Sequence, residues 1–298
     1  MTAWVLGLSL AWATPEVPRW KWEQAHTWLI STRIRAEDVF RVEDRRNTEA
    51  RLVGLQIHLL TTCTPVDVWR ESRWAELRCD IDEISLKGDW FRGDSVDAAE
   101  EILIEWTEIL EGHAWMQLVM RDDGRLVSMS LEGVENEQWK MSAIHTSMHM
   151  WLARAYAGFD LTLPQPDTEG ESGWLDLHLS RPYQFPRLDG SFGIAETVHL
   201  WRPSSREGLR LIWSRGRALV ERRGSAQYRT ILDGTAFFDP QRGVLTDRTY
   251  VIFSEPTSGH LGAQGMYFNA GQELHMRLIG PETPAPSLPE SGLRSSPQ

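Results

Sequence analysis

Apolar and polar residues alternate along many short segments of the sequence, and this pattern restricts the possible folds more than any other feature. In the segment 26–34, Trp28, Ile30 and Ile34 fall on one face of an extended chain, whereas polar residues occupy the other face. Side chains alternate between the two faces of a sheet, so this pattern predicts a half-buried strand. We expect further strands at 52–62, 74–86, 102–110, 114–121, 126–131, 174–179, 209–213, 218–220, 228–238, 244–253, 266–268 and 273–279.

Turn-forming residues separate these expected strands. Asp123 and Gly124 tolerate the positive φ angles of a tight hairpin, and the segment 239–243 contains a proline and a glycine. We also expect a turn at 214–216, which would divide two short strands. Many short strands with regular turns indicate an antiparallel sheet, arranged as a curved sheet, a sandwich or a partial barrel.

One segment departs from the alternation. Between residues 137 and 157, Met141, Ile144, Met148 and Trp151 follow one another at spacings of three and four residues, which predicts an amphipathic helix. The sequence therefore predicts an α+β protein that is predominantly antiparallel β. In this fold, two β-meander halves accompany one central helix near residues 137–157.

This prediction divides the chain into six parts. The parts are a signal peptide (1–13), a first β-meander half (14–135), the helix (136–158), an acidic connector rich in proline and glycine (159–173), a second β-meander half (174–279) and a disordered tail (280–298). The tail is assigned from its content of Pro, Ser and Glu, which supplies too little apolar surface for a packed core.

The first residues of the chain indicate export. The apolar run 5–11 leads into the triplet 11–13, which has small residues at Ala11 and Ala13. This pattern fits cleavage by signal peptidase, so the mature chain would begin at Thr14. The alternative is a buried N-terminal strand. Export predicts a periplasmic or extracellular protein.

The two cysteines of the chain fit the same compartment. Cys63 and Cys79 flank a short excursion between two expected strands, and antiparallel pairing of those strands would bring them together. We expect a disulfide, which is typical of exported proteins. The alternative is a pair of unrelated buried thiols.

The acidic balance of the chain limits its partners. It has 31 basic and 42 acidic residues, a formal net charge of −11, which disfavours binding to the phosphate backbone of nucleic acids. No run of about 20 apolar residues occurs, so we expect no transmembrane helix.

Two histidines on the expected helix are candidates for a metal site. His145 and His149 are four residues apart and share a helix face, so they can chelate one ion. Thr146 stands where a zinc protease of the His-Glu-x-x-His type has its catalytic glutamate. The alternative is that both histidines pack the edge of the helix against the sheet.

Aromatic and methionine residues on the helix are candidates for ligand binding, because methionine adapts to irregular apolar surfaces. Trp139, Met141, Met148 and Trp151 would line a cleft between helix and sheet. The sequence thus predicts an exported bacterial envelope protein, without cofactor or catalytic residues, that binds an apolar small molecule or an envelope protein. The alternative is a metal-dependent hydrolase that uses His145 and His149. The sequence gives no prediction of the oligomeric state.

Overall fold

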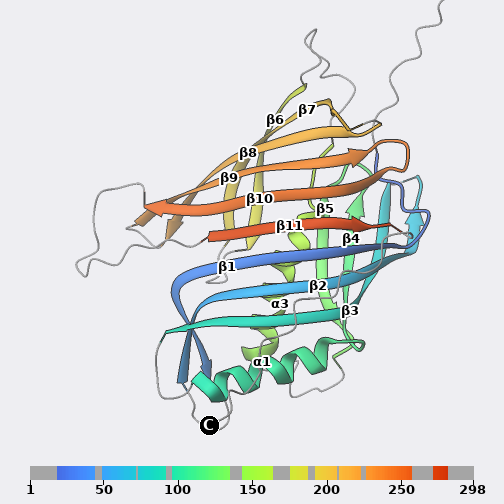
Figure 1. Ribbon diagram of the computed structural model, residues 1–298. Coiled ribbons are helices and arrows are strands. Elements are labelled where there is room, and N and C mark those ends of the chain that lie inside the picture. Colours follow the sequence, from blue (N-terminus) through green and yellow to red (C-terminus); the bar gives the residue numbers. More distant parts are fainter. Residues whose placement is uncertain are drawn as a thin grey trace, which may run out of the picture.

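A computed structural model of the chain describes residues 19–43, 49–71, 73–91, 96–134, 143–163, 175–186, 192–206, 208–222, 226–256 and 271–280. Its dominant element is one antiparallel sheet of 11 strands, which curves strongly along its length (Figure 1). The sheet is open, because β5 and β6 stand at its two ends and do not pair with each other within the described residues.

The strands of the two halves of the sequence occupy the two halves of the sheet. The first half contains β1 (His26–Glu43), β2 (Glu49–Trp69), β3 (Trp74–Phe91), β4 (Trp115–Arg121) and β5 (Leu126–Glu132). The second half contains β6 (Leu175–Pro186), β7 (Phe192–Pro203), β8 (Arg210–Arg222), β9 (Ala226–Asp239), β10 (Val244–Pro256) and β11 (Gly271–Ile279).

Each half is a meander, and the two meanders join at the centre of the sheet. The spatial order is β5-β4-β3-β2-β1-β11-β10-β9-β8-β7-β6, so adjacent strands are consecutive in sequence everywhere except at the β1–β11 junction. There the first and last strands run antiparallel, with Trp28 opposite Leu278 and Ile30 opposite Met276. The predicted antiparallel fold with two meander halves is confirmed.

Two α-helices pack against the sheet in the described part of the chain. Helix α3 (Ala143–Tyr156) continues into the short 3-10 helix η1 (Ala157–Phe159), and α3 contacts β1 and both edge strands, β5 and β6. Figure 1 shows α3 behind the central strands and α1 (Val96–Leu110) beside β3. The helix predicted near residues 137–157 is therefore present as α3.

The strand predicted at 102–110 is wrong, because these residues belong to helix α1. Ile102, Leu103, Trp106 and Leu110 are buried, with spacings of one, three and four residues, whereas Ile104 is exposed. A strand would place Ile102, Ile104 and Trp106 on the same face. The apolar residues fit both periods in the sequence, and packing against β3 selects the helix.

The turn predicted at 214–216 is also wrong. Strand β8 runs through it without a break, and Ser214 pairs with His199 of β7 and Gly234 of β9. Ser214 is itself buried, so its polar side chain does not mark a surface turn. The strand predicted at 266–268, the tail from 281 and the expected signal peptide lie outside the described residues.

The core lies between the sheet and α3 with η1. Trp28 of β1 meets Phe159 edge-on at 4.9 Å between ring centroids, and Trp106 of α1 meets Trp151 of α3 at 5.1 Å. These rings are almost completely buried. Aromatic pairs of this kind contribute beyond the apolar area that they bury, so they help fix both helices on the sheet.

Two buried polar side chains hold the C-terminal end of α3. Arg248 of β10 donates from Nη1 to the carbonyl oxygens of Gly158 (2.6 Å) and Asp160 (2.8 Å). Gln272 of β11 donates from Nε2 to the carbonyl oxygen of Arg154 at 3.1 Å. The last carbonyl groups of a helix have no hydrogen-bond donors within the helix. Here Arg248 and Gln272 of the second meander are the donors.

Candidate ligand-binding groove

A short extended segment crosses one end of the sheet, and we call residues 19–23 the strap. The backbone N–H of Trp20 donates to the carbonyl oxygen of Asp122 in the β4–β5 turn (3.0 Å). The N–H of Lys21 donates to the carbonyl oxygen of Gly243 in the β9–β10 turn (2.8 Å). The strap therefore links a turn of the first meander to a turn of the second.

Aromatic stacking fixes the strap on the core. Trp20 and Trp22 stack with ring centroids 4.9 Å apart and an interplanar angle of 10°, and Trp20 also meets Phe238 of β9 edge-on. Both indoles are buried, whereas the alternate residues Arg19, Lys21 and Glu23 are more exposed. The strap thus buries its tryptophans and leaves its charged side chains accessible.

A glycine with positive φ stands where the strap meets each turn. Gly124 has φ +87° and Gly243 has φ +64°. A Cβ at Gly124 would overlap the carbonyl oxygen of Leu161, and one at Gly243 would overlap the side chain of Lys21. Both turns therefore require glycine for conformation and for the close approach of their neighbours.

The β2–β3 hairpin ends in a cluster of exposed apolar side chains, which we call the hairpin tip. The exposed fractions are 61% for Val66, 42% for Val68, 40% for Trp69 and 37% for Trp74, and Trp69 pairs with Trp74 across the strands. These are four of the seven large apolar residues that are exposed in the described part of the chain. Such clustering, in contrast to scattered exposure, is typical of binding surfaces.

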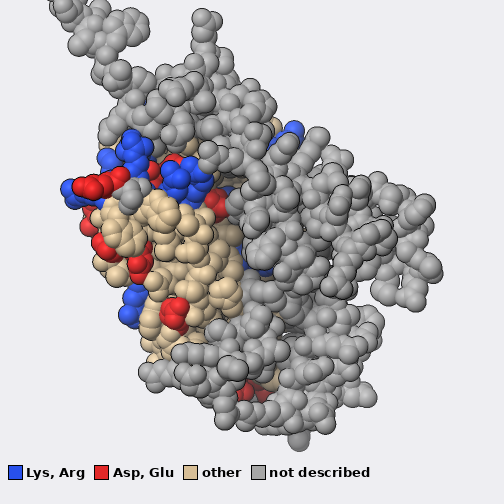
Figure 2. Space-filling model, turned by 180° about the vertical axis from the view of Figure 1, so that it is seen from behind, with Lys and Arg blue, Asp and Glu red and all other residues tan. Residues whose placement is uncertain are grey.

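The strap and the hairpin tip enclose a groove with a volume of about 1000 Å³. Its lining residues are 19–23, 65–70 and 73–75, together with Asp122 and Pro240. Figure 2 shows charged side chains gathered at one end of the described surface, beside an area of uncharged residues. The volume is at the upper end of the range for small-molecule sites.

Four cationic and three acidic side chains line the groove: Arg19, Lys21, Arg70 and Arg73, with Glu23, Asp67 and Asp122. Asp122 faces two of the arginines, since its Oδ2 lies 3.2 Å from Arg19 Nη1 and 4.0 Å from Arg73 Nε. Lys21 Nζ donates to the carbonyl oxygen of Gln241 (3.1 Å). The lining is therefore slightly positive, although the whole chain carries a net charge of −11.

The β4–β5 turn beside the groove is held by a buried carboxylate. Arg125 Nε donates to Asp123 Oδ2 (2.9 Å), and Arg121 Nε lies 3.7 Å from the same oxygen. Burial raises the pKa of the Asp123 carboxyl, but the hydrogen bonds from Arg125 and the charges of Arg125 and Arg121 outweigh burial and lower it below its ordinary value. The turn that receives the strap is thus fixed by a charged pair.

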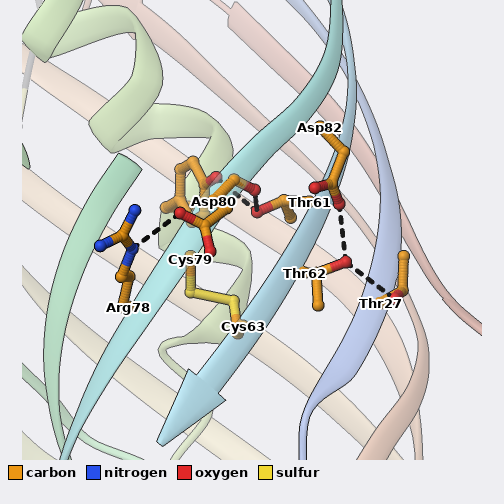
Figure 3. The surroundings of a disulfide bond; sticks show 9 residues. Thr27, Thr61, Thr62, Cys63, Arg78, Cys79, Asp80 and Asp82 are labelled. Atoms are coloured by element: carbon orange, nitrogen blue, oxygen red, sulfur yellow. Dashed lines mark hydrogen bonds and ion pairs between the residues drawn. A yellow bond between two sulfur atoms is a disulfide. The ribbon is translucent and has the colours of Figure 1, made fainter. Parts of the chain in front are cut away.

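The predicted disulfide is confirmed (Figure 3), and Cys63 precedes the hairpin tip on β2. Cys63 of β2 and Cys79 of β3 are register partners, and both are buried. The Tyr156 hydroxyl lies 2.8 Å from Thr61 Oγ1, which itself donates to the carbonyl oxygen of Asp80 (2.8 Å). The disulfide and this network join β2, β3 and α3, so the hairpin extends from a rigid base.

The ligand-binding residues predicted on the helix do not line this groove where the structure describes them. Met148 and Trp151 are buried in the core, with exposed fractions of 1% and 2%. Trp139 and Met141 lie outside the described residues. Ligand binding by these four residues stays a prediction.

The metal site predicted at His145 and His149 also stays a prediction. Both residues belong to α3, His149 is half-buried, and the side chain of His145 lies outside the described part. Among the side chains that are described, no three His, Cys, Asp or Glu residues come close enough to hold a metal ion.

Comparisons with known proteins give no family for this fold and groove. No protein-family model matches the sequence, and no curated protein matches it. Within the described ranges, no helix has the length and apolar character needed to cross a membrane.

The groove was not predicted from the sequence, although one signal was present. The segment 64–69 extends β2 beyond Cys63 and contains the exposed Val66 and Val68, although a register shift between Pro65 and Asp67 interrupts the alternation. Because this stretch was interpreted as a connection between two strands, its apolar residues were not recognised as a candidate binding surface. The strap gives no local signal, because its partners are about 100 and 220 residues away in the sequence.

Proposed function

We propose that this protein is an exported, non-enzymatic binding protein that takes an apolar ligand in the groove between the strap and the hairpin tip. The observation that supports this function most directly is the clustering of Val66, Val68, Trp69 and Trp74 beside a groove of about 1000 Å³. An occupant that covers these side chains removes their apolar surface from water, which contributes about 25 cal/mol for each Å² buried.

The architecture around the groove suits binding without large rearrangement. The strap is tied to two turns by backbone hydrogen bonds, and the hairpin is braced by the Cys63–Cys79 disulfide. Rigid walls reduce the conformational entropy that a ligand must overcome when it binds.

The disulfide supports export, because such bonds persist in oxidising compartments and are rare in the cytosol. The expected compartment is the periplasm or the extracellular space. Intact-mass measurement of the protein recovered from the periplasm of an expressing bacterium tests this. We expect a chain that starts at Thr14 and lacks two thiol hydrogens. A full-length, reduced chain found only in the cytosol contradicts export.

Titration with Nile red, a neutral apolar dye, tests the groove. The variant Val66→Ser/Val68→Ser removes apolar surface from the hairpin tip. The matched control Val127→Ser/Val251→Ser makes the same change at valines on β5 and β10 that are 46% and 40% exposed. We expect the first variant to bind about tenfold more weakly, as the loss of a few buried methyl groups implies. Equal affinities of the two variants contradict the proposed site.

A further inference from the structure

The groove combines apolar surface with positive charge. Its apolar side chains come from the hairpin tip, whereas Arg19 and Lys21 come from the strap, and Arg70 and Arg73 come from the turn of the hairpin. An occupant that lies against the hairpin tip therefore has cationic groups near it on both segments that line the groove.

Four cations line the groove against the three carboxylates of Glu23, Asp67 and Asp122, so one positive charge is in excess. Asp122 is a single carboxylate that faces both Arg19 and Arg73. Lys21 Nζ bonds to a neutral carbonyl oxygen, and Arg70 has no ion pair with a described carboxylate. A local excess of positive charge in a chain with a net charge of −11 favours an anionic group in this place.

Resting on the proposed function, we infer that the ligand is a free single-chain anionic amphiphile of the fatty-acid type. Its chain lies against Val66, Val68 and the tryptophans of the hairpin tip. Its acidic head lies toward Lys21 and Arg70, where charge-assisted hydrogen bonds to the ammonium or guanidinium group compensate it. The apolar tip supplies most of the affinity, and the cations supply the selectivity.

Calorimetric titration with two probes of equal chain length separates these contributions. The probes are dodecanoate and the neutral octaethylene glycol monododecyl ether, both used below their micelle-forming concentrations. We expect dodecanoate to bind about three- to tenfold more tightly at low salt, because exposed charge pairs are individually weak. The preference should fall as added salt screens the charges.

Matched charge variants locate the selectivity. Lys21→Gln/Arg70→Gln removes two groove cations, and Lys87→Gln/Arg277→Gln removes one lysine and one arginine from exposed positions on β3 and β11. We expect the first variant to bind both probes equally and the second to retain the preference for dodecanoate. All four positions are accessible, so circular dichroism and thermal unfolding should match the parent protein.

The outcomes distinguish this inference from the proposed function. Equal binding of the two probes by the parent protein overturns the anionic ligand and leaves the apolar groove in place. Binding of neither probe overturns both. A preference that survives Lys21→Gln/Arg70→Gln places the selectivity elsewhere and overturns the inference. Association with anionic phospholipid vesicles without binding of monomeric dodecanoate assigns the surface to a bilayer and also overturns it.

Discussion

The backbone N–H of Trp20 lies 3.0 Å from the carbonyl oxygen of Asp122 and donates a hydrogen bond to it. This contact joins the beginning of the described chain to the β4–β5 turn, and the next residue makes the equivalent contact with the β9–β10 turn. The strap therefore connects one turn of each meander at one end of the sheet and forms one side of the groove.

Loss of the strap anchor should destabilise the fold. Trp20→Ala removes a buried indole that stacks on Trp22 and contacts Phe238, so we expect a loss of about 3–5 kcal/mol in the free energy of unfolding. Trp74→Ala, at the partly exposed hairpin tip, should cost less than Trp20→Ala because it removes less buried apolar area. Urea denaturation of both variants measures the difference. Equal losses contradict an anchoring role for Trp20.

Arg248 should stabilise the fold through its hydrogen bonds to the carbonyl oxygens of Gly158 and Asp160. Arg248→Met keeps an apolar stem but removes the donor to the buried carbonyl oxygen of Gly158 and the part-buried carbonyl oxygen of Asp160. We expect a loss of about 2–4 kcal/mol, because each unsatisfied buried acceptor costs about 1–3 kcal/mol. Arg277→Met, at an exposed position, serves as the control in the same thermal unfolding assay. If Arg248→Met loses no more stability than Arg277→Met, solvent replaces the guanidinium and the expected role of Arg248 is contradicted.

Asp123 should make the fold sensitive to acid. Its pKa is below the ordinary value in the folded protein, so the unfolded chain takes up the proton first as the pH falls. The stabilisation is complete above the ordinary pKa and is lost as the pH falls through the lower folded value. We therefore expect the advantage of the parent protein over Asp123→Asn to shrink from about pH 5 downward. Denaturation curves measured across this pH range test it, and a constant difference contradicts it.

The disulfide should stabilise the hairpin. It closes a loop across a sequence separation of 16 residues, for which the loop-entropy model gives about 3 kcal/mol. Cys63→Ser/Cys79→Ser should lose about that amount in urea denaturation without reductant. Parent protein treated with reductant should approach the variant. A parent protein whose stability does not change on verified reduction would show that the bond contributes little.

The sequence predicted elements whose periodicity is local and unambiguous. Trp28, Ile30 and Ile34 alternate on β1 and are all buried, and the Cys63–Cys79 pair followed from two flanking strands. Strand β7 was not predicted, because Glu196 interrupts the alternation between Ile194 and Val198.

The remaining features depend on contacts between distant parts of the chain. The apolar residues of α1 are compatible with a strand or a helix in the sequence, and packing against β3 selects the helix. The groove depends on the strap meeting the turns at Asp122 and Gly243, and these turns are brought to one end of the sheet only by the order of its strands. Sequence patterns within a window of residues contain neither relationship.

Photo-crosslinking with an alkyl diazirine, followed by peptide mapping by mass spectrometry, tests the location of the apolar site most directly. We expect the probe to label residues 65–70, 73–75 and the strap 19–23, and we expect an excess of dodecanoate to suppress this labelling. Labelling concentrated on α3 around Met148 and Trp151 would contradict the groove and favour the cleft predicted between helix and sheet. Labelling spread evenly over the surface would contradict a specific apolar site on this protein.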